Sequence, residues 1–267
     1  MSRIAATFES LKQAERKALV PFITAGDPHP SITVRLMHTL VEAGATMLEL
    51  GVPFSDPMAD GPVIQRASER ALEHNVSMKD VLEMVKTFRE TNADTPIILM
   101  GYLNPVEVMG YAEFAAAAAA AGVDGAIIVD LPPQEAGDLL AEMKAQQLDP
   151  IFLMSPTTTE ERIELITSAA SGFVYYVSLK GVTGAATLDI QEVKDKLKQI
   201  KKHTDLPIGV GFGISDADKA QQMSKISDAV IVGSALVKQI EANSSDHDAI
   251  LAAARELIGG MRQAMDS

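Results

Sequence analysis

Two carboxylates, Glu49 and Asp60, are the side chains of this sequence best placed to do chemistry. Glu49 lies in the apolar run Met47–Leu50, which reads as a short strand ended by Gly51. A lone charge in such a strand is costly unless the carboxylate is paired, protonated or next to a ligand. Asp60 follows in a loop where three prolines exclude both helix and strand pairing. One carboxylate on a strand and another on a loop form a candidate acid/base pair.

Both residues also have a plainer interpretation. Glu49 could form a structural ion pair, although Lys and Arg are scarce near it in the sequence. Asp60 stands before Gly61 and Pro62, where an aspartate serves as an ordinary turn residue.

Clusters of glycine in the second half of the chain point to a phosphate site. They are Gly181 with Thr183 and Gly184, then Gly211-Phe212-Gly213, and finally Gly233-Ser234. Glycine lets the backbone approach an anion closely, and helix N-termini present free N–H groups. The sequence contains neither G-x-G-x-x-G nor the G-x-x-x-x-G-K-[ST] loop, so we expect no dinucleotide or nucleoside triphosphate.

The elements that position these residues alternate between strand and helix along the whole chain. Eight strands are predicted: Leu19–Ala25, Met47–Leu50, Pro96–Met100, Gly125–Val129, Ile151–Met154, Gly172–Ser178, Pro207–Val210 and Asp228–Val232. Most are near-continuous apolar runs, as parallel strands covered on both faces should be. The pattern predicts an α/β protein, a single (β/α)8 TIM barrel over residues 1–267 with an extra N-terminal helix at Ser2–Ala14. A doubly wound open sheet is the alternative.

Within this alternation, Val106–Ala121 is predicted as one helix, and its alanine run is interpreted as a tightly packed face. In such barrels the active site lies at the C-terminal ends of the strands, and the loops after the last two strands commonly hold phosphate. Glu49 and the glycine clusters all fall in such positions.

Composition narrows the function further. The chain has 267 residues, 47% of them hydrophobic and 22% charged, as is typical of globular proteins. No apolar run is long enough to span a membrane, and a net charge of −13 argues against binding nucleic acid. The absence of cysteine favours the cytoplasm. The five histidines are scattered without ligand spacing, so we expect no metal site.

Several motifs resemble those of the tryptophan synthase α subunit family. They are Glu49-Leu50-Gly51-Val52-Pro53-Phe54-Ser55-Asp56-Pro57 with Ala59-Asp60-Gly61-Pro62, then Ser178 with Gly181-Val182-Thr183-Gly184, Gly211-Phe212-Gly213-Ile214 and Val232-Gly233-Ser234-Ala235. The resemblance runs in order over essentially the whole chain. It implies a (β/α)8 barrel that cleaves indole-3-glycerol phosphate to indole and glyceraldehyde 3-phosphate, without a metal or organic cofactor in this chain.

The resemblance also implies roles for individual residues. Glu49 would be the general acid/base, and Asp60 would hydrogen-bond the indole N–H. Residues implied to line or close the indole pocket are Phe22, Tyr102, Ile127, Val129, Tyr175, Thr183 and Phe212. Residues implied to hold the phosphate are Gly184, Gly213, Gly233 and Ser234.

By the same resemblance the chain would pair with a β subunit in an α2β2 heterotetramer. That subunit would carry pyridoxal phosphate (PLP) and receive the indole. The residues implied to face it are Phe54, Asp56, Pro57 and Met58, with Asn104 and Pro105. A partner would explain apolar side chains on an exposed loop.

Two other functions remain open from the residues alone. One is an isomerase or aldolase acting on a sugar phosphate in another phosphate-binding barrel. The other is a non-catalytic subunit that only activates a partner, although the presence of both Glu49 and Asp60 speaks against it.

Overall fold

The computed structural model describes residues 2–178, 190–211 and 213–267. In this part of the chain nine strands form one parallel sheet in the order β5-β4-β3-β2-β1-β9-β8-β7-β6. The strands are β1 (Ala18–Thr24), β2 (Leu48–Gly51), β3 (Ile97–Gly101), β4 (Gly125–Ile128), β5 (Asp149–Pro150), β6 (Leu153–Met154), β7 (Val174–Val177), β8 (Ile208–Gly211) and β9 (Ala229–Val232).

The strands at the two ends of that order, β5 and β6, follow each other in one short segment of the chain. Because the two ends of the sheet are joined in this way, the sheet closes into a barrel. The first part of the segment pairs with β4 and its last part with β7. Between them, the Ile151 N–H donates to the Ala126 carbonyl at 3.0 Å, and the Phe152 carbonyl accepts from Tyr175 N–H at 3.1 Å. In place of the predicted fifth strand, Ile151–Met154, residues 149–154 form two short strands, because this segment changes partners halfway, and only β6 lies within the predicted range.

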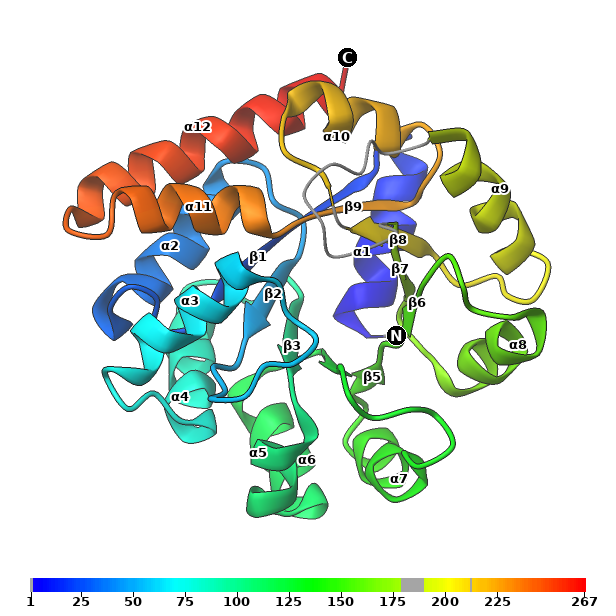
Figure 1. Ribbon diagram of the computed structural model, residues 1–267, viewed down its shortest axis with the longest axis horizontal. Coiled ribbons are helices and arrows are strands. Elements are labelled where there is room, and N and C mark those ends of the chain that lie inside the picture. Colours follow the sequence, from blue (N-terminus) through cyan, green and yellow to red (C-terminus); the bar gives the residue numbers. More distant parts are fainter. Residues whose placement is uncertain (1, 179–189, 212) are drawn as a thin grey trace.

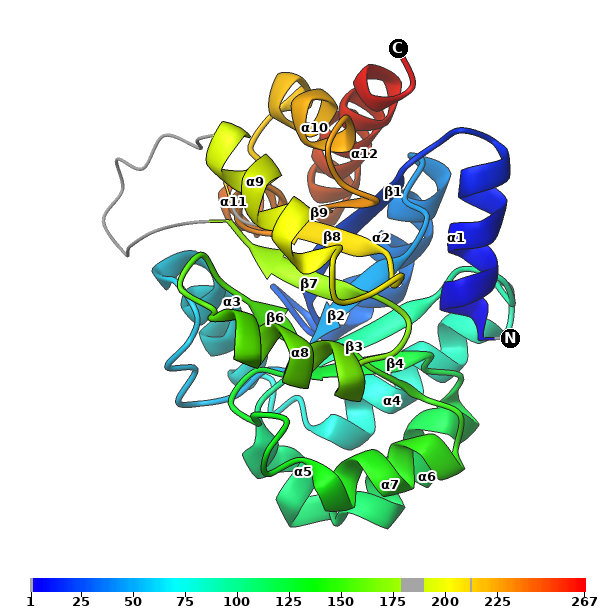
Figure 2. The same ribbon diagram turned by 90° about the vertical axis from the view of Figure 1, so that its right-hand side faces the viewer.

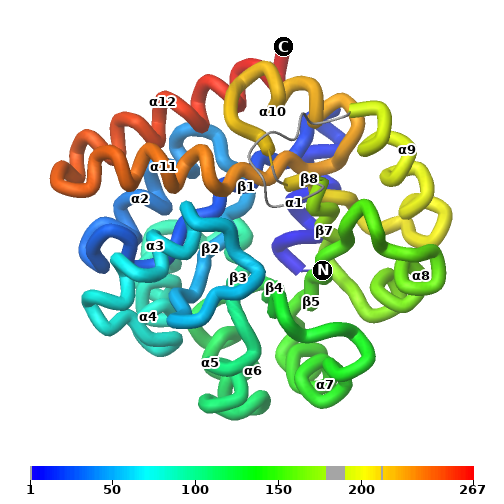
Figure 3. Tube along the Cα trace, viewed as in Figure 1, coloured from blue at the N-terminus to red at the C-terminus, as the bar shows by residue number. Residues whose placement is uncertain are grey.

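Helices surround the barrel, as Figures 1 and 3 show. Those on the outside are α2 (Pro30–Glu42), α3 (Pro62–Leu72), α4 (Met78–Arg89), α5 (Leu103–Met109), α6 (Tyr111–Ala121), α7 (Gly137–Ala145), α8 (Glu160–Ala169), α9 (Ile190–Ile200), α10 (Ala217–Ser224), α11 (Ser234–Ala242) and α12 (His247–Met265). The predicted (β/α)8 barrel is confirmed. Within the described residues, no helix is both long enough and apolar enough to cross a membrane.

One predicted helix was wrong. Val106–Ala121 is two helices, α5 and α6, that meet at Gly110. Gly110 has φ +89°, a left-handed conformation that glycine adopts without strain and that interrupts an α-helix. The expected packed face of the alanine run is present, because Ala115, Ala118 and Ala121 are buried.

The additional helix α1 (Arg3–Gln13) covers the N-terminal end of the barrel, across from the connection between β2 and α3 (Figure 2). Ile4, Phe8 and Leu11 are its buried residues and belong to the cluster that fills the barrel interior. The ring of Phe8 lies 5.9 Å from that of Phe173, which precedes β7. This end of the barrel is therefore sealed by apolar packing.

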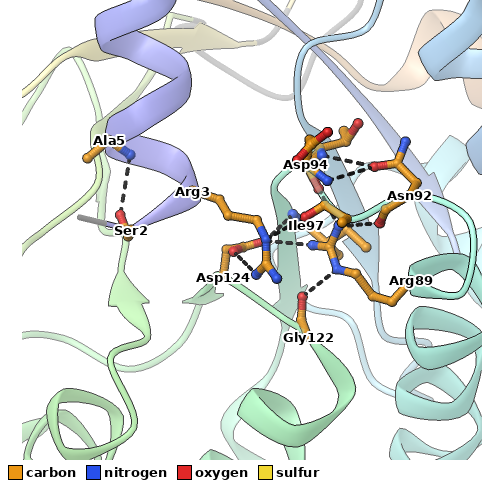
Figure 4. Close-up of polar contacts among 11 residues, drawn as sticks. Ser2, Arg3, Ala5, Arg89, Asn92, Asp94, Ile97, Gly122 and Asp124 are labelled. Atoms are coloured by element: carbon orange, nitrogen blue, oxygen red, sulfur yellow. Dashed lines mark hydrogen bonds and ion pairs between the residues drawn. The ribbon is translucent and has the colours of Figure 1, made fainter.

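Asp124, just before β4, fastens the same end with a fully hydrogen-bonded carboxylate (Figure 4). One of its oxygens accepts from Arg3 at 2.8 Å. The other accepts from Arg89 at 2.7 Å and from the Ile97 N–H at 2.8 Å. The Asp124 side chain is 4% exposed, so these three donors replace the water it lost on folding.

Candidate active site

Glu49 lies in the middle of β2, between Phe22 of β1 and Ile98 of β3 in register. It is 1% exposed, and its Oε1 atom has no hydrogen-bond partner among the described residues. Removal from water, and secondly the negative charge of Asp60, raise the pKa of Glu49 to about 8. The carboxyl group is therefore protonated at neutral pH and can donate a proton.

The phenol of Tyr175, on β7, faces Glu49 from across the barrel. Burial, and then the charge on Glu49, raise the pKa of Tyr175 well above its usual value. A Cβ atom at Gly211 would lie 2.1 Å from the Tyr175 hydroxyl oxygen, so the ring occupies the space that a side chain at 211 would need. Glycine at 211 thus allows Tyr175 to point toward Glu49.

Asp60 comes from the connection between β2 and α3 and is held by Tyr102, the residue after β3. The Tyr102 hydroxyl donates to Asp60 Oδ2 at 2.9 Å and accepts from the Ala59 N–H at 3.0 Å. Gln65 on α3 donates to the Asp60 carbonyl at 2.9 Å. Burial raises the pKa of Asp60, and the hydrogen bond from Tyr102 opposes that rise.

A pocket opens beside these groups at the C-terminal ends of the strands. It contains Asp60 and three residues predicted for the substrate pocket, namely Phe22, Tyr102 and Val129. The remaining lining residues are Thr24, Gly51, Val52, Ile64, Ser68, Met100 and Gly101. Ile127 is 1% exposed and packs in the interior cluster with Tyr175, below this pocket.

Sequence reasoning missed two hydroxyl side chains of the pocket, Thr24 and Ser68. Thr24 Oγ1 is buried without a hydrogen-bond partner among the described residues. A signal for Thr24 exists in the sequence, since it is a polar residue in the apolar strand β1, as Glu49 is in β2. Ser68 has no comparable signal, because a serine inside a helix is common on a solvated face.

The glycines predicted to hold phosphate follow β8 and β9, which are neighbours in the sheet. Gly213 has φ +78°, a conformation that side chains rarely adopt. Gly233 is the N-cap of α11, and Ser234 is the first residue of that helix. A Cβ atom at Gly233 would lie 3.9 Å from Phe22 Cβ, so this turn borders the pocket. Thr183, Gly184 and Phe212 lie outside the described residues.

The residues predicted to face a partner form two neighbouring segments. Phe54 stacks on Tyr102, with ring centroids 5.3 Å apart, while Asp56 is exposed and Met58 is 79% exposed. Pro57 is half-buried beside them, and the α5 residues Asn104 and Pro105 are exposed and half-buried, respectively. Val108, also on α5, was missed. It is 84% exposed, and its alternation with buried Val106 is the signal that could have identified it.

Asp27, a buried carboxylate in the turn after β1, is paired, in contrast to Glu49. Asp27 is bonded to Arg70 at 2.6 and 2.9 Å, and Arg70 also contacts Glu241 at 3.0 Å. No basic side chain among the described residues pairs with Glu49, so the structural ion pair considered for it is not found there.

The histidines are less scattered in space than in sequence. The ring of His29 lies 4.5 Å from that of His74 and 6.2 Å from that of His247. Even so, the described part of the chain holds no group of three or more His, Cys, Asp or Glu residues arranged to bind a metal ion.

Known proteins resemble this chain over its full length. The family model described as tryptophan synthase alpha chain matches residues 8–266. A tryptophan synthase alpha chain of Thioalkalivibrio sulfidiphilus is 62% identical over 266 residues, and the match covers 100% of both chains. One of Marinobacter nauticus is 58% identical over 267 residues, covering 100% of this chain and 99% of the relative. The crystal structure of tryptophan synthase subunit alpha from Legionella pneumophila superposes with a TM-score of 0.92 at 49% identity, covering 100% of this chain and 99% of that one.

Proposed function

The chain belongs to the tryptophan synthase alpha chain family, and from this membership and the site we propose how it cleaves indole-3-glycerol phosphate. The reaction of the family is a retro-aldol cleavage that yields indole and glyceraldehyde 3-phosphate. One observation carries the proposal for this chain. Glu49 is a buried carboxyl group with one unpartnered oxygen and a pKa raised to about 8, close to a second carboxylate.

Glu49 supplies the proton that the reaction needs. The carbon–carbon bond breaks only after C3 of the indole ring has been protonated, and a carboxyl group that is neutral at pH 7 can donate that proton. The resulting Glu49 carboxylate then accepts the proton of the hydroxyl on the carbon attached to C3. As that hydroxyl becomes the aldehyde, the electron pair of the broken bond returns to the ring, and Glu49 ends protonated as it began.

Asp60 stabilises the charge that protonation creates. Protonating C3 places a positive charge on the indole nitrogen, whose N–H is then a strong donor. A carboxylate held at that nitrogen lowers the energy of the charged state more than that of the neutral substrate, which is electrostatic catalysis. The Asp60–Tyr102 hydrogen bond supports this role, because it fixes the carboxylate before the charge appears.

The substrate is held at its two ends. Phe22, Tyr102, Val129 and Tyr175 supply an apolar setting for the indole, with Ile127 beneath them. Gly213, Gly233 and Ser234 hold the phosphate through backbone N–H groups and the N-terminus of α11. We assign Thr183 and Phe212 to the indole and Gly184 to the phosphate by family resemblance.

The indole passes to the β chain of tryptophan synthase, with which this chain forms an α2β2 heterotetramer. We propose that the surface of Phe54, Asp56, Pro57, Met58, Asn104 and Pro105 contacts that partner. We further propose that PLP resides in the partner, that the 267 residues act as one catalytic domain, and that the complex works in the cytoplasm. The exposure of Met58 supports a partner on this face.

Indole release from indole-3-glycerol phosphate tests this function directly. The purified chain is assayed alone and with an added PLP-containing β subunit. We expect slow release of indole and an equal amount of glyceraldehyde 3-phosphate from the chain alone, and faster release with the partner. No release from a folded chain in either assay would contradict the proposal, and trapping of the chain with substrate by borohydride would favour a Schiff-base aldolase instead.

A further inference from the structure

Tyr102 connects the catalytic loop to the surface predicted for the partner. Its hydroxyl is shared between Asp60 Oδ2 and the Ala59 N–H, at 2.9 and 3.0 Å. The face of its ring stacks on Phe54 with an interplanar angle of 28°. The Tyr102 side chain is 4% exposed. It contacts the loop between β2 and α3 near its start, at Phe54, and near its end, at Ala59 and Asp60.

The backbone of Tyr102 extends the same connection. Tyr102 is the N-cap residue of α5, the helix that carries Asn104, Pro105 and the exposed Val108. Two segments of the predicted partner surface, one on the loop and one on α5, thus meet at this residue. The loop segment also reaches the Asp60 backbone, because the Asp60 N–H donates to the Pro57 carbonyl at 3.0 Å, whereas the hydrogen bond to the Asp60 carboxylate comes from Tyr102.

We infer that Tyr102 is a positioning residue that holds the Asp60 carboxylate in place for the indole nitrogen, and that docking of the β chain on Phe54 and α5 acts on Asp60 through it. The inference rests on the proposed function and goes beyond it. A stacked ring transmits movement of Phe54, and the hydroxyl at its far end passes that movement to Ala59 and Asp60.

The hydrogen bond from the Tyr102 hydroxyl also affects the pKa of Asp60, and so whether Asp60 is charged. The titratable groups that face Asp60 in the described structure are Tyr102 from the end of β3 and Glu49 from β2. Donation by Tyr102 favours ionised Asp60, whereas burial disfavours it. Loss of the hydroxyl therefore raises the pKa of Asp60, and the acid side of the rate profile moves to higher pH.

The variant Tyr102→Phe removes the hydroxyl and keeps the ring, so the contact with Phe54 remains. We expect kcat for indole release by the chain alone to fall about tenfold, with a smaller change in KM. We also expect the acid limb of kcat/KM to shift upward, and the stimulation by the β subunit to fall severalfold. The matched control is Tyr111→Phe, which removes a hydroxyl bonded to Glu107 on α5, away from the pocket. Its kcat and pH profile without partner should equal those of the native chain.

Two results would overturn the inference. One is a Tyr102→Phe variant with native kcat, native pH profile and native stimulation. The other is an increase in KM alone, which would make Tyr102 only a wall of the pocket. If Tyr102→Phe does not fold, Phe54→Leu tests the other side of the ring, and unchanged stimulation by the partner would overturn the inference. A native chain that releases no indole would instead contradict the proposed function.

Discussion

Asp124, just before β4, and Glu49, on β2, are both buried carboxylates of one barrel, yet their surroundings are opposite. Asp124, at the end closed by α1, accepts hydrogen bonds from Arg3, Arg89 and the Ile97 N–H. Glu49, at the open end, has an oxygen without any partner among the described residues and a pKa raised to about 8. A buried charge with all its partners holds structure together, whereas a buried carboxyl group without them costs stability and is ready to transfer a proton.

Asp27 and Asp60 show the same contrast between a carboxylate with an ionic partner and one without. Asp27 is buried and paired to Arg70, which fastens the turn after β1 to α3. Within the described part of the chain, the Asp60 carboxylate accepts its hydrogen bond from a neutral phenol, that of Tyr102, so it keeps capacity for a further donor. Burial alone therefore does not mark a catalytic carboxylate, and neither does one unpartnered oxygen, because Asp149 Oδ2 also lacks a partner among the described residues. Glu49 combines an unpartnered oxygen with the nearby negative charge of Asp60.

The largest effect on stability is expected at Asp124. Asp124→Ala leaves Arg89, whose side chain is 11% exposed, and the Ile97 N–H without their acceptor. We expect a loss of about 3 kcal/mol in the free energy of unfolding, measured by urea denaturation. The control is Asp248→Ala, whose ion pair with Arg35 is exposed at both ends and should change stability by less than about 0.5 kcal/mol. Equal losses of stability for the two variants would contradict the claim that the buried, fully paired Asp124 stabilises the fold more than an exposed ion pair does.

Asp60→Asn should have a large effect on catalysis and little on folding. The amide keeps the size of the side chain but carries no negative charge to stabilise the protonated indole. We expect kcat for indole release to fall about 100-fold. Asp246→Asn makes the same chemical change at the N-cap of α12, where asparagine also caps well, and should leave activity unchanged. A fall of less than about threefold for Asp60→Asn would contradict the electrostatic role.

The pH dependence of kcat/KM tests the role of Glu49 as the acid. Since the pKa of Glu49 lies at about 8 and the protonated form acts, kcat/KM should fall at pH values above about 8. The charge of Asp60 contributes to that raised pKa, so the residual activity of Asp60→Asn should decline at lower pH than that of the native chain. A native profile that stays flat to pH 9 would mean that Glu49 is not the acid.

The smallest expected effect concerns the phosphate. Gly213→Val places a side chain in a left-handed backbone position, φ +78°, and obstructs approach of the backbone to an anion. We expect KM to rise about tenfold with a smaller change in kcat, measured by steady-state indole release. Gly260→Val on α12, where a Cβ atom meets nothing within 4 Å, serves as the control for a glycine far from the pocket. An unchanged KM would exclude Gly213 from the phosphate site.

The sequence predicted the barrel well because strands and helices alternate and their ends are marked by glycine and proline. It failed at Gly110, since glycine inside a helical pattern can be tolerated or can break the helix, and only the observed φ separates the two. It also failed at the fifth strand, where partners change between β4 and β7 within one short segment. Such a change depends on the closed barrel and leaves no local signal.

For the site, the sequence predicted the close approach of Glu49 and Asp60, because an apolar strand makes a lone carboxylate conspicuous. It could not show that Glu49 lacks an ionic partner, because that requires knowing where Arg and Lys from distant segments lie. The link from Asp60 through Tyr102 to Phe54 joins three separate positions in space and was likewise beyond the sequence. The signal at Thr24 was present but easy to overlook, since threonine is common in strands.

The most direct test of the central claim measures stability and activity in one variant, Glu49→Gln. The folded chain holds the Glu49 proton more tightly than the unfolded chain, with pKa values of about 8 and 4.5. The stability that this gives is present in full below pH 4.5 and is lost as pH rises through about 8. Glutamine does not titrate, so the variant should gain about 3.5 kcal/mol relative to the native chain between pH 5 and pH 8. Its indole release should fall about 1,000-fold while substrate still binds. A variant that is less stable than the native chain at pH 8, or that still releases indole at the native rate, would contradict the account.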